Sequence, residues 1–177
     1  MHAHKLVAGS KFPAIRVSQL GGGEIDLATP LNGHDWRLVV VYRGRHCPKC
    51  TQYLSELNDK IKELNALGVD VMAVSGDPEE KAKEHMQLVN PAYPVGYALT
   101  IAQMQELGLY ISNPRSPQET DRPFPEPGLF VINEEGRAQI IDISNAPFAR
   151  PDLNAIVAGI NFIRDPEKNY LIRGTYS

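Results

Sequence analysis

The chain contains two cysteines, Cys47 and Cys50, separated by only two residues in the segment VYRGRHCPKC. A disulfide stabilises a fold mainly by closing a long loop of the unfolded chain, and this pair would close almost none. In a reducing compartment, a CxxC of this kind indicates metal binding or redox catalysis rather than a structural crosslink. The chemistry expected at this segment is therefore that of a reactive thiol pair.

The pair lies between a predicted strand and a predicted helix. Residues 37–42 (RLVVVY) form a β-branched run that is typical of a strand buried on both faces. After the cysteines, apolar residues recur at helical spacing until Gly68, which is placed to end the helix. Cys47 would thus lie at the first helical turn, where free backbone N–H groups and the helix dipole favour a thiolate and lower its pKa. Pro48 suits this turn because no hydrogen bond is lost there.

Nearby side chains are expected to lower the pKa of Cys47 further by adding positive charge. These are Arg43, Arg45, His46 and Lys49. Cys50, one turn further along the helix, could attack a mixed disulfide at Cys47 and release the partner as a thiol. We therefore interpret Cys47 as the nucleophile and Cys50 as the resolving cysteine.

Two other interpretations of the pair remain open. The cysteines could be incidental core residues on one helical turn. They could also bind zinc together with His46, but zinc normally takes four ligands, and no second CxxC or HxxxH motif supplies the remainder. We predict no metal and no cofactor.

The remaining pattern predicts an α/β fold in one domain over residues 1–177. The expected order is a hairpin (14–19 and 24–27), strand 37–42, a helix ending near Gly68, strand 69–74, a helix to about 89, a short strand 95–97, a helix 101–107, a hairpin (129–132 and 139–143) and a helix 151–164. Asp77 is expected to cap the helix in which Pro78 is first and Glu80 completes a capping box. The proline-rich residues 112–127 predict an ordered loop or flap. Such an order gives a mixed central sheet covered by helices, which fits the thioredoxin arrangement.

Composition excludes several classes of protein. The formal net charge is -3 and no run of lysine or arginine occurs, so a nucleic-acid partner has no electrostatic support. The N-terminus lacks the apolar stretch of a signal peptide, and the most apolar run, residues 38–42, is too short to cross a bilayer. We expect a cytoplasmic protein that binds neither nucleic acid nor membrane.

Four segments, in the right order, resemble the peroxiredoxin-like (alkyl hydroperoxide reductase / thiol-specific antioxidant) branch of the thioredoxin superfamily. They are KLVAGSKFPAIRVSQLGGGEIDLA, LVVVYRGRHCPKC, VMAVSGDPEE and PGLFVINEEGRAQIIDIS. The resemblance covers most of the chain and implies a thioredoxin-like fold with an N-terminal hairpin.

The active-site pattern departs from that family at three positions of four. By alignment, Arg43 stands at the family's proline, Cys47 at its threonine and Cys50 at its peroxide-attacking cysteine. Pro127 stands where peroxiredoxins carry a catalytic arginine and where thioredoxins carry a cis-proline facing the active-site disulfide beside an open backbone edge. We therefore expect a cis Glu126–Pro127 bond and assign Pro127 to the catalytic site.

Three further residues are candidates for supporting roles at the site. The carboxylate that thioredoxins bury beneath the CxxC is missing, so Glu126 and Asp77 are candidates, by position alone, for handling the proton of Cys50. Arg150 resembles an arginine that peroxiredoxins carry after the late hairpin, although helix capping or surface exposure would explain it equally well.

The resemblance and the CxxC together favour an oxidoreductase. The first hypothesis is a thiol–disulfide oxidoreductase acting on protein or small-molecule disulfides. The alternative is a peroxiredoxin-like thiol peroxidase reducing hydroperoxides, and a second alternative is a non-enzymatic redox sensor or binding module. Either enzyme needs an unidentified thiol reductant, and a homodimer stays open.

Overall fold

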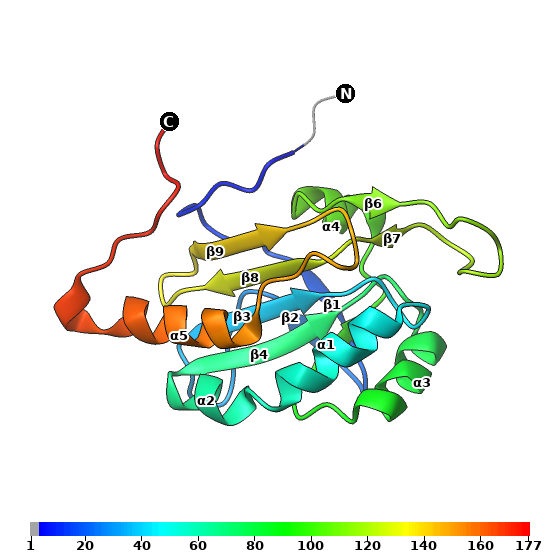
Figure 1. The fold of residues 1–177 in the computed structure, drawn as a ribbon, viewed down its shortest axis with the longest axis horizontal. Coiled ribbons are helices and arrows are strands. Elements are labelled where there is room, and N and C mark those ends of the chain that lie inside the picture. Colours follow the sequence, from blue (N-terminus) through cyan, green and yellow to red (C-terminus); the bar gives the residue numbers. More distant parts are fainter. Residues whose placement is uncertain (1–3) are drawn as a thin grey trace.

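The computed structural model describes residues 4–177 as a mixed sheet covered by helices (Figure 1). The strands are β1 Arg16–Gln19, β2 Glu24–Asp26, β3 Trp36–Val41, β4 Val69–Val74, β5 Val95–Tyr97, β6 Ile111–Ser112, β7 Phe124–Pro125, β8 Gly128–Ile132 and β9 Ala138–Ile143. The helices are α1 Pro48–Asn58, α2 Ile61–Ala66, α3 Glu79–Val89, α4 Ile101–Glu106, α5 Leu153–Arg164 and the short 3-10 helix η1 Pro166–Lys168. No helix within these residues is long and apolar enough to span a membrane.

Seven strands form the central sheet in the order β2-β1-β5-β4-β3-β8-β9. β3 pairs in parallel with β4, and β4 with β5, whereas β8 joins β3 antiparallel and β9 joins β8 as a hairpin. This is the predicted thioredoxin-like mixed sheet, and it is confirmed. The predicted N-terminal hairpin is also confirmed, and it extends the sheet because β1 pairs with β5.

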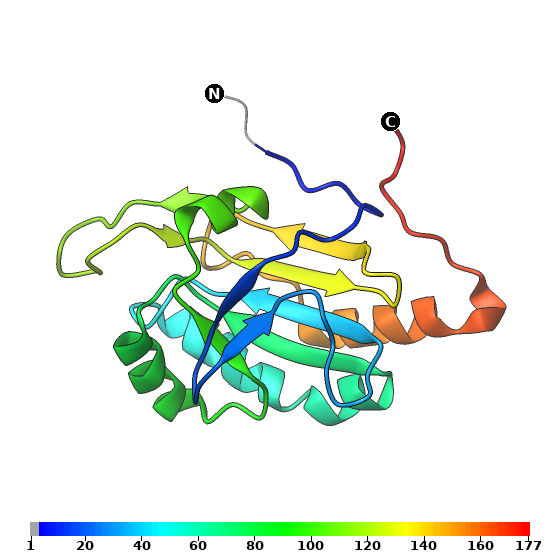
Figure 2. The same cartoon turned by 180° about the vertical axis from the view of Figure 1, so that it is seen from behind.

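Successive side chains of the central strands face opposite sides of the sheet and divide the core into two layers. In β3, Leu38 and Val40 face one apolar cluster while Val39 and Val41 face the other, and all four are buried. The first cluster is covered by α1, α2, α3 and α5. The second lies beneath the N-terminal segment and α4, on the side that Figure 2 shows. The continuous β-branched run is thus explained by burial on both faces.

The helix after the cysteines is interrupted, contrary to the single helix expected up to Gly68. α1 ends at Asn58, and the N–H groups of Asp59 and Lys60 bond back three residues to Glu56 and Leu57, in a tightened turn. The side chain of Asn58 is engaged elsewhere, because its Nδ2 donates to the carbonyl of Val89 (3.0 Å) at the end of α3. A tertiary contact therefore coincides with the break, and the local periodicity could not reveal it.

The expected cap of α3 is also wrong. The helix begins at Glu79 after Pro78, and no side chain caps it. The Asp77 carboxylate instead accepts a hydrogen bond from the backbone N–H of Arg45 (2.8 Å), in the loop before the cysteines. Asp77 therefore fixes that loop rather than the helix.

The proline-rich residues form an ordered ribbon, as expected for a flap. β6 and β7 pair with each other, apart from the main sheet, and the connecting turn projects from the body of the molecule (Figure 1). Lys81 of α3 holds the turn through an ion pair with Asp121 (2.7 Å). The ribbon is thereby anchored beside the end of the sheet at which the cysteines lie.

A buried ion pair lies at the other end of β3 and β4. The Arg37 guanidinium is fully buried, and its Nη2 lies 3.2 Å from Asp70 Oδ2, which also accepts the N–H of Leu31 (2.7 Å). Arg37 also donates to the carbonyl oxygens of Asp26 and Thr29. The pair therefore ties the segment after β2 to the central strands.

Replacing Arg37 with alanine should lower the free energy of unfolding by about 3–5 kcal/mol, because Asp70 is left as a buried charge without its partner. Urea denaturation measures this loss. Arg16→Ala, which removes an exposed arginine from β1, serves as the control and should change the free energy by no more than about 0.5 kcal/mol. Equal losses in the two variants would contradict the assigned role of the buried pair.

Candidate active site

Cys47 is the N-cap residue of α1. Its backbone is extended (φ −114°, ψ 101°), Pro48 occupies the first helical position, and Cys47 Sγ accepts a hydrogen bond from the N–H of Cys50 (3.3 Å). The pKa of Cys47 is lowered to about 5, first by the hydrogen bond from the Cys50 thiol and then by Arg43, the Cys50 N–H and the charge of Arg150, against the opposing effect of burial. Cys47 therefore carries a thiolate at neutral pH, as its place before a helix predicts.

Cys50 has the opposite electrostatics. It is fully buried, and burial together with the neighbouring Cys47 raises the pKa of its thiol. Its sulfur accepts the backbone N–H of Arg43 (3.3 Å) and lies 3.0 Å from Nη2 of Arg150. The pair thus holds a single negative charge, located mainly on Cys47, while Cys50 keeps its proton.

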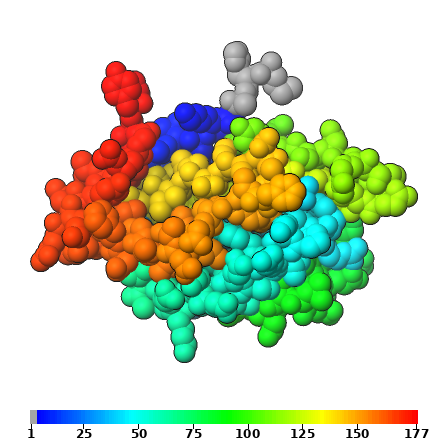
Figure 3. All heavy atoms as spheres, viewed as in Figure 1, coloured from blue at the N-terminus to red at the C-terminus, as the bar shows by residue number. Residues whose placement is uncertain are grey.

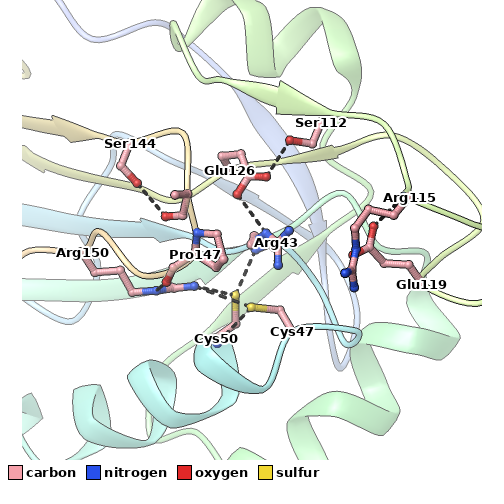
Figure 4. A network of polar contacts seen from close by, with 11 residues as sticks. Arg43, Cys47, Cys50, Ser112, Arg115, Glu119, Glu126, Ser144, Pro147 and Arg150 are labelled. Carbon is pink, nitrogen blue, oxygen red and sulfur yellow. Dashed lines mark hydrogen bonds and ion pairs between the residues drawn. The ribbon is translucent and has the colours of Figure 1, made fainter.

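Arg150 reaches both sulfurs from the loop between β9 and α5 (Figure 4). Its Nη2 lies 3.7 Å from Cys47 Sγ, while its Nε donates to the carbonyl of Pro147 (2.7 Å), which fixes the guanidinium. The cap of α5 is Asp152, so Arg150 does not cap that helix. The sequence left the role of Arg150 undecided, and its resemblance to an arginine after the late hairpin was the signal that pointed to it.

Arg43 also lies beside the sulfurs (Figure 4) and belongs to a buried network. Its Nε lies 2.9 Å from Glu126 Oε1, and Glu126 Oε2 accepts the hydroxyl of Ser112 (2.6 Å). The guanidinium carbon also lies 4.8 Å from the ring centre of Phe124 on the ribbon. The pKa of Arg43 is raised despite desolvation, chiefly by its hydrogen bond to Cys47 and the charge of Glu126. Arg43 therefore stays charged beside the thiolate.

The two carboxylates considered for proton transfer are committed to other partners. Glu126 binds Arg43 and Ser112, and Asp77 accepts the N–H of Arg45. Within residues 4–177, no hydrogen bond joins either carboxylate to Cys50. Glu126 instead acts on the site through Arg43.

The other predicted cations contribute less than expected. Arg45 pairs with Glu84 on α3, and Lys49 is exposed on the first turn of α1. Burial and the charge of Arg43 lower the pKa of His46 to about 4, so His46 is neutral at pH 7. The expected positive charge at His46 is therefore wrong; its ring packs edge-on against Phe124, with the ring centres 4.4 Å apart.

Pro127 does not form the expected cis-proline. The chain contains no cis peptide bond between residues 4 and 177, so the Glu126–Pro127 bond is trans. The backbone beside it is also paired, because the carbonyl of Pro127 accepts the N–H of Ser144 (3.1 Å) and the N–H of Glu126 donates to Tyr110 (2.8 Å). These groups have partners within the chain, so this edge is not open to an incoming peptide.

A cavity of about 350 Å³ lies in front of Cys47. Arg43, His46 and Lys49 line it together with Arg115 and Glu119 of the ribbon and Phe148 of the loop that carries Arg150. Cys47 itself is only 1% exposed, yet it belongs to the cavity wall, whereas Cys50 does not. Across residues 4–177, no three His, Cys, Asp or Glu side chains are grouped to hold a metal ion.

The reactivity of Cys47 should follow its lowered pKa. Alkylation by iodoacetamide should be slow below pH 5 and rise to a plateau above it, because only the thiolate reacts. Arg150→Gln should move the midpoint upward by about one pH unit or more, since an opposite charge is removed from the thiolate.

Arg45→Gln is the matched control, because the side chain of Arg45 pairs with Glu84. Its alkylation midpoint should stay close to that of the unchanged protein. A midpoint near pH 9 in the unchanged protein, or equal shifts in the two variants, would contradict the electrostatic assignment.

Solved structures share this fold at low sequence identity. Peroxiredoxin 6 of Arenicola marina, in a cysteine-to-serine mutant, has a TM-score of 0.75 and 17% identity over 90% of this chain and 74% of its own. Peroxidoxin BcpB from Mycobacterium tuberculosis has a TM-score of 0.72 and 18% identity over 91% of this chain and 100% of its own. Mycobacterium bovis AhpC has a TM-score of 0.73 and 14% identity over 97% of this chain and 98% of its own. A comparison with curated protein sequences gives no match.

The sequence itself matches a family model over most of its length. Residues 8–140 match the AhpC/TSA family. This match covers the N-terminal hairpin, the cysteine pair and the late hairpin as far as residue 140, and the sheet order and the ionised cysteine before α1 agree with it. The chain therefore belongs to the AhpC/TSA family and is a peroxiredoxin-like, thiol-dependent oxidoreductase of the thioredoxin superfamily.

Proposed function

We propose that the protein is a thiol peroxidase that reduces hydroperoxides with the Cys47–Cys50 dithiol. The observation that carries the proposal is the thiolate of Cys47, with a pKa of about 5, in the wall of a cavity of about 350 Å³. A cavity of that size admits a small hydroperoxide, and the thiolate is the form that attacks it. Membership of the AhpC/TSA family supports the same activity.

The reaction balances with two thiols as the reductant. The Cys47 thiolate attacks the terminal oxygen of ROOH, the O–O bond breaks, and the alkoxide leaves and takes a proton to become ROH. Cys47 is then a sulfenic acid. The Cys50 sulfur attacks it, the S–O bond breaks, and the hydroxide leaves with the Cys50 proton as water, so that the Cys47–Cys50 disulfide forms. The dithiol loses two electrons and the peroxide gains them.

Two arginines supply the electrostatic stabilisation that the attack needs. Arg43 and Arg150 hold positive charge beside the sulfurs, where negative charge moves from sulfur to the departing oxygen. The family's threonine and arginine are replaced by Cys47 and Pro127, so this chain needs another source of that charge. Arg43 stands where the family has a proline and fills this need in our proposal.

The thiol–disulfide oxidoreductase expected from the CxxC is the second candidate. An N-terminal helical thiolate next to a buried second thiol is equally suited to disulfide exchange. Against a protein substrate stands the backbone around Pro127, whose groups are already paired within the chain. We therefore place hydroperoxide reduction first.

One equivalent of hydrogen peroxide or an organic hydroperoxide should convert the reduced protein to the Cys47–Cys50 disulfide. Stopped-flow mixing measures the rate of this oxidation, and mass spectrometry identifies the disulfide. In Cys50→Ser, a sulfenic acid on Cys47 should accumulate and react with dimedone, because the resolving thiol is missing. Cys47→Ser should react with peroxide at least about tenfold more slowly than the unchanged protein, because Cys50 is buried and keeps its proton.

The control for this experiment uses a disulfide instead of a peroxide. A disulfide-containing protein such as insulin should be reduced slowly by the same dithiol. Fast insulin reduction combined with no reaction toward peroxide would reverse the order of the two candidates.

A further inference from the structure

We propose that the cavity in front of Cys47 binds a small thiol that carries a carboxylate, and that this anionic thiol reduces the Cys47–Cys50 disulfide. The inference rests on the proposed function, because it names the electron donor for the same site. It follows from three features of the cavity: its charge, its size and the presence of Cys47 in its wall.

The cavity wall has an excess of positive charge. Arg43, Lys49 and Arg115 supply three cations, while Glu119 is the only carboxylate among the residues that line the cavity. Glu119 pairs with Arg115 (2.8 Å) on the ribbon, and Glu126 pairs with Arg43 (2.9 Å), so Lys49 remains as the excess. In the view of Figure 4, Cys47 lies between Arg150 on one side and Arg115 with Glu119 on the other.

Oxidation increases this excess. In the dithiol, the Cys47 thiolate neutralises part of the charge of Arg43 and Arg150. Formation of the disulfide removes that thiolate and leaves the same guanidinium groups without it. An anion is therefore attracted more strongly to the oxidised protein than to the reduced protein, and the oxidised protein is the form that a reductant must find.

The shape of the site favours a small molecule over a protein as this reductant. Cys47 is 1% exposed at the wall of a cavity of about 350 Å³. The loop after β9 lies against the beginning of α1, as the orange and cyan surfaces in Figure 3 show, and the ribbon lines the cavity on another side. The backbone edge near Pro127 is paired, so a protein partner could not dock there by adding a strand.

The exchange consumes two molecules of the small thiol and restores the Cys47–Cys50 dithiol. The thiolate RS⁻ attacks Cys47 Sγ, the S–S bond breaks, and Cys50 leaves as a thiolate that takes a proton. The N–H of Arg43 and the guanidinium of Arg150 lie beside Cys50 Sγ, where the charge of the leaving group develops. A second RS⁻ attacks the mixed disulfide, which releases RSSR and the Cys47 thiolate. The two thiols lose two electrons and the protein disulfide gains them.

The test compares three thiols of similar size and different charge on the oxidised protein. The probes are 3-mercaptopropionate (anionic), 2-mercaptoethanol (neutral) and cysteamine (cationic), with rates expressed per concentration of thiolate and followed by quenched mass spectrometry. The anionic thiol should be the fastest at low ionic strength, and its advantage should shrink as salt is added. Equal rates, or the opposite order, would overturn the proposal.

Two variants locate the effect in the cavity. Lys49→Gln and Arg115→Gln should each lower the ratio of the anionic rate to the neutral rate by about threefold to fivefold, the effect of one unit charge a few ångströms away in water. The ratio cancels any change in the disulfide itself. Lys62→Gln, an exposed lysine on α2, is the matched control and should keep the ratio. A ratio that is unchanged in both cavity variants would contradict the assigned site.

Failure of this proposal is distinguishable from failure of the proposed function. The disulfide can be formed with diamide as well as with peroxide, so the reductant test proceeds even if peroxide does not oxidise the protein. A protein that ignores peroxide but prefers the anionic thiol would retain the donor site and lose the peroxidase assignment.

Discussion

A single negative charge shared between two sulfur atoms is the interaction on which this site depends. Cys47 and Cys50 lie within one helical turn, so ionising both would place two like charges in contact in a buried environment. The pKa of Cys47 falls to about 5 and the pKa of Cys50 rises. One thiol is therefore ready to attack while the other retains the proton that the second step releases, so the two roles differ although the residues are chemically identical.

The sheet topology brings the charges that hold this thiolate to one place. β8 runs antiparallel to β3, so the end of β3 meets the beginning of β8, with Val41 opposite Gly128. β9 returns along β8 and ends there too, with Ile143 opposite Gly128. Arg43 follows β3, Glu126 precedes β8, and Arg150 lies in the loop after β9. Three segments, around residues 43, 126 and 150, thus meet at the first turn of α1.

The departures from the AhpC/TSA pattern form a consistent set. By the resemblance, Arg43 stands at the family's proline, and its buried partner Glu126 lies next to Pro127, which stands at the family's arginine. Cys47 replaces a threonine and supplies the low-pKa thiol, while Cys50 keeps the family's cysteine position with the Arg43 N–H and Arg150 beside it. The chain therefore keeps the positive charge around a reactive sulfur but draws it from different residues.

The sequence alone indicated most of the order of the elements and placed the cysteine pair between a strand and a helix. The β-branched runs, the CxxC after a strand and the apolar periodicity of α1 act through neighbouring residues, so they predict local structure reliably. Tertiary structure decided the features of the site that depend on contacts between residues far apart in the sequence. Burial and the charge of Arg43 keep His46 neutral, and the Asp77 carboxylate accepts the N–H of Arg45 instead of capping α3. The Glu126–Pro127 bond is trans between paired backbone groups. Arg150 is about a hundred positions from the cysteines, and only the folded sheet brings its guanidinium within reach of them, because charge interactions depend on distance in space rather than along the chain.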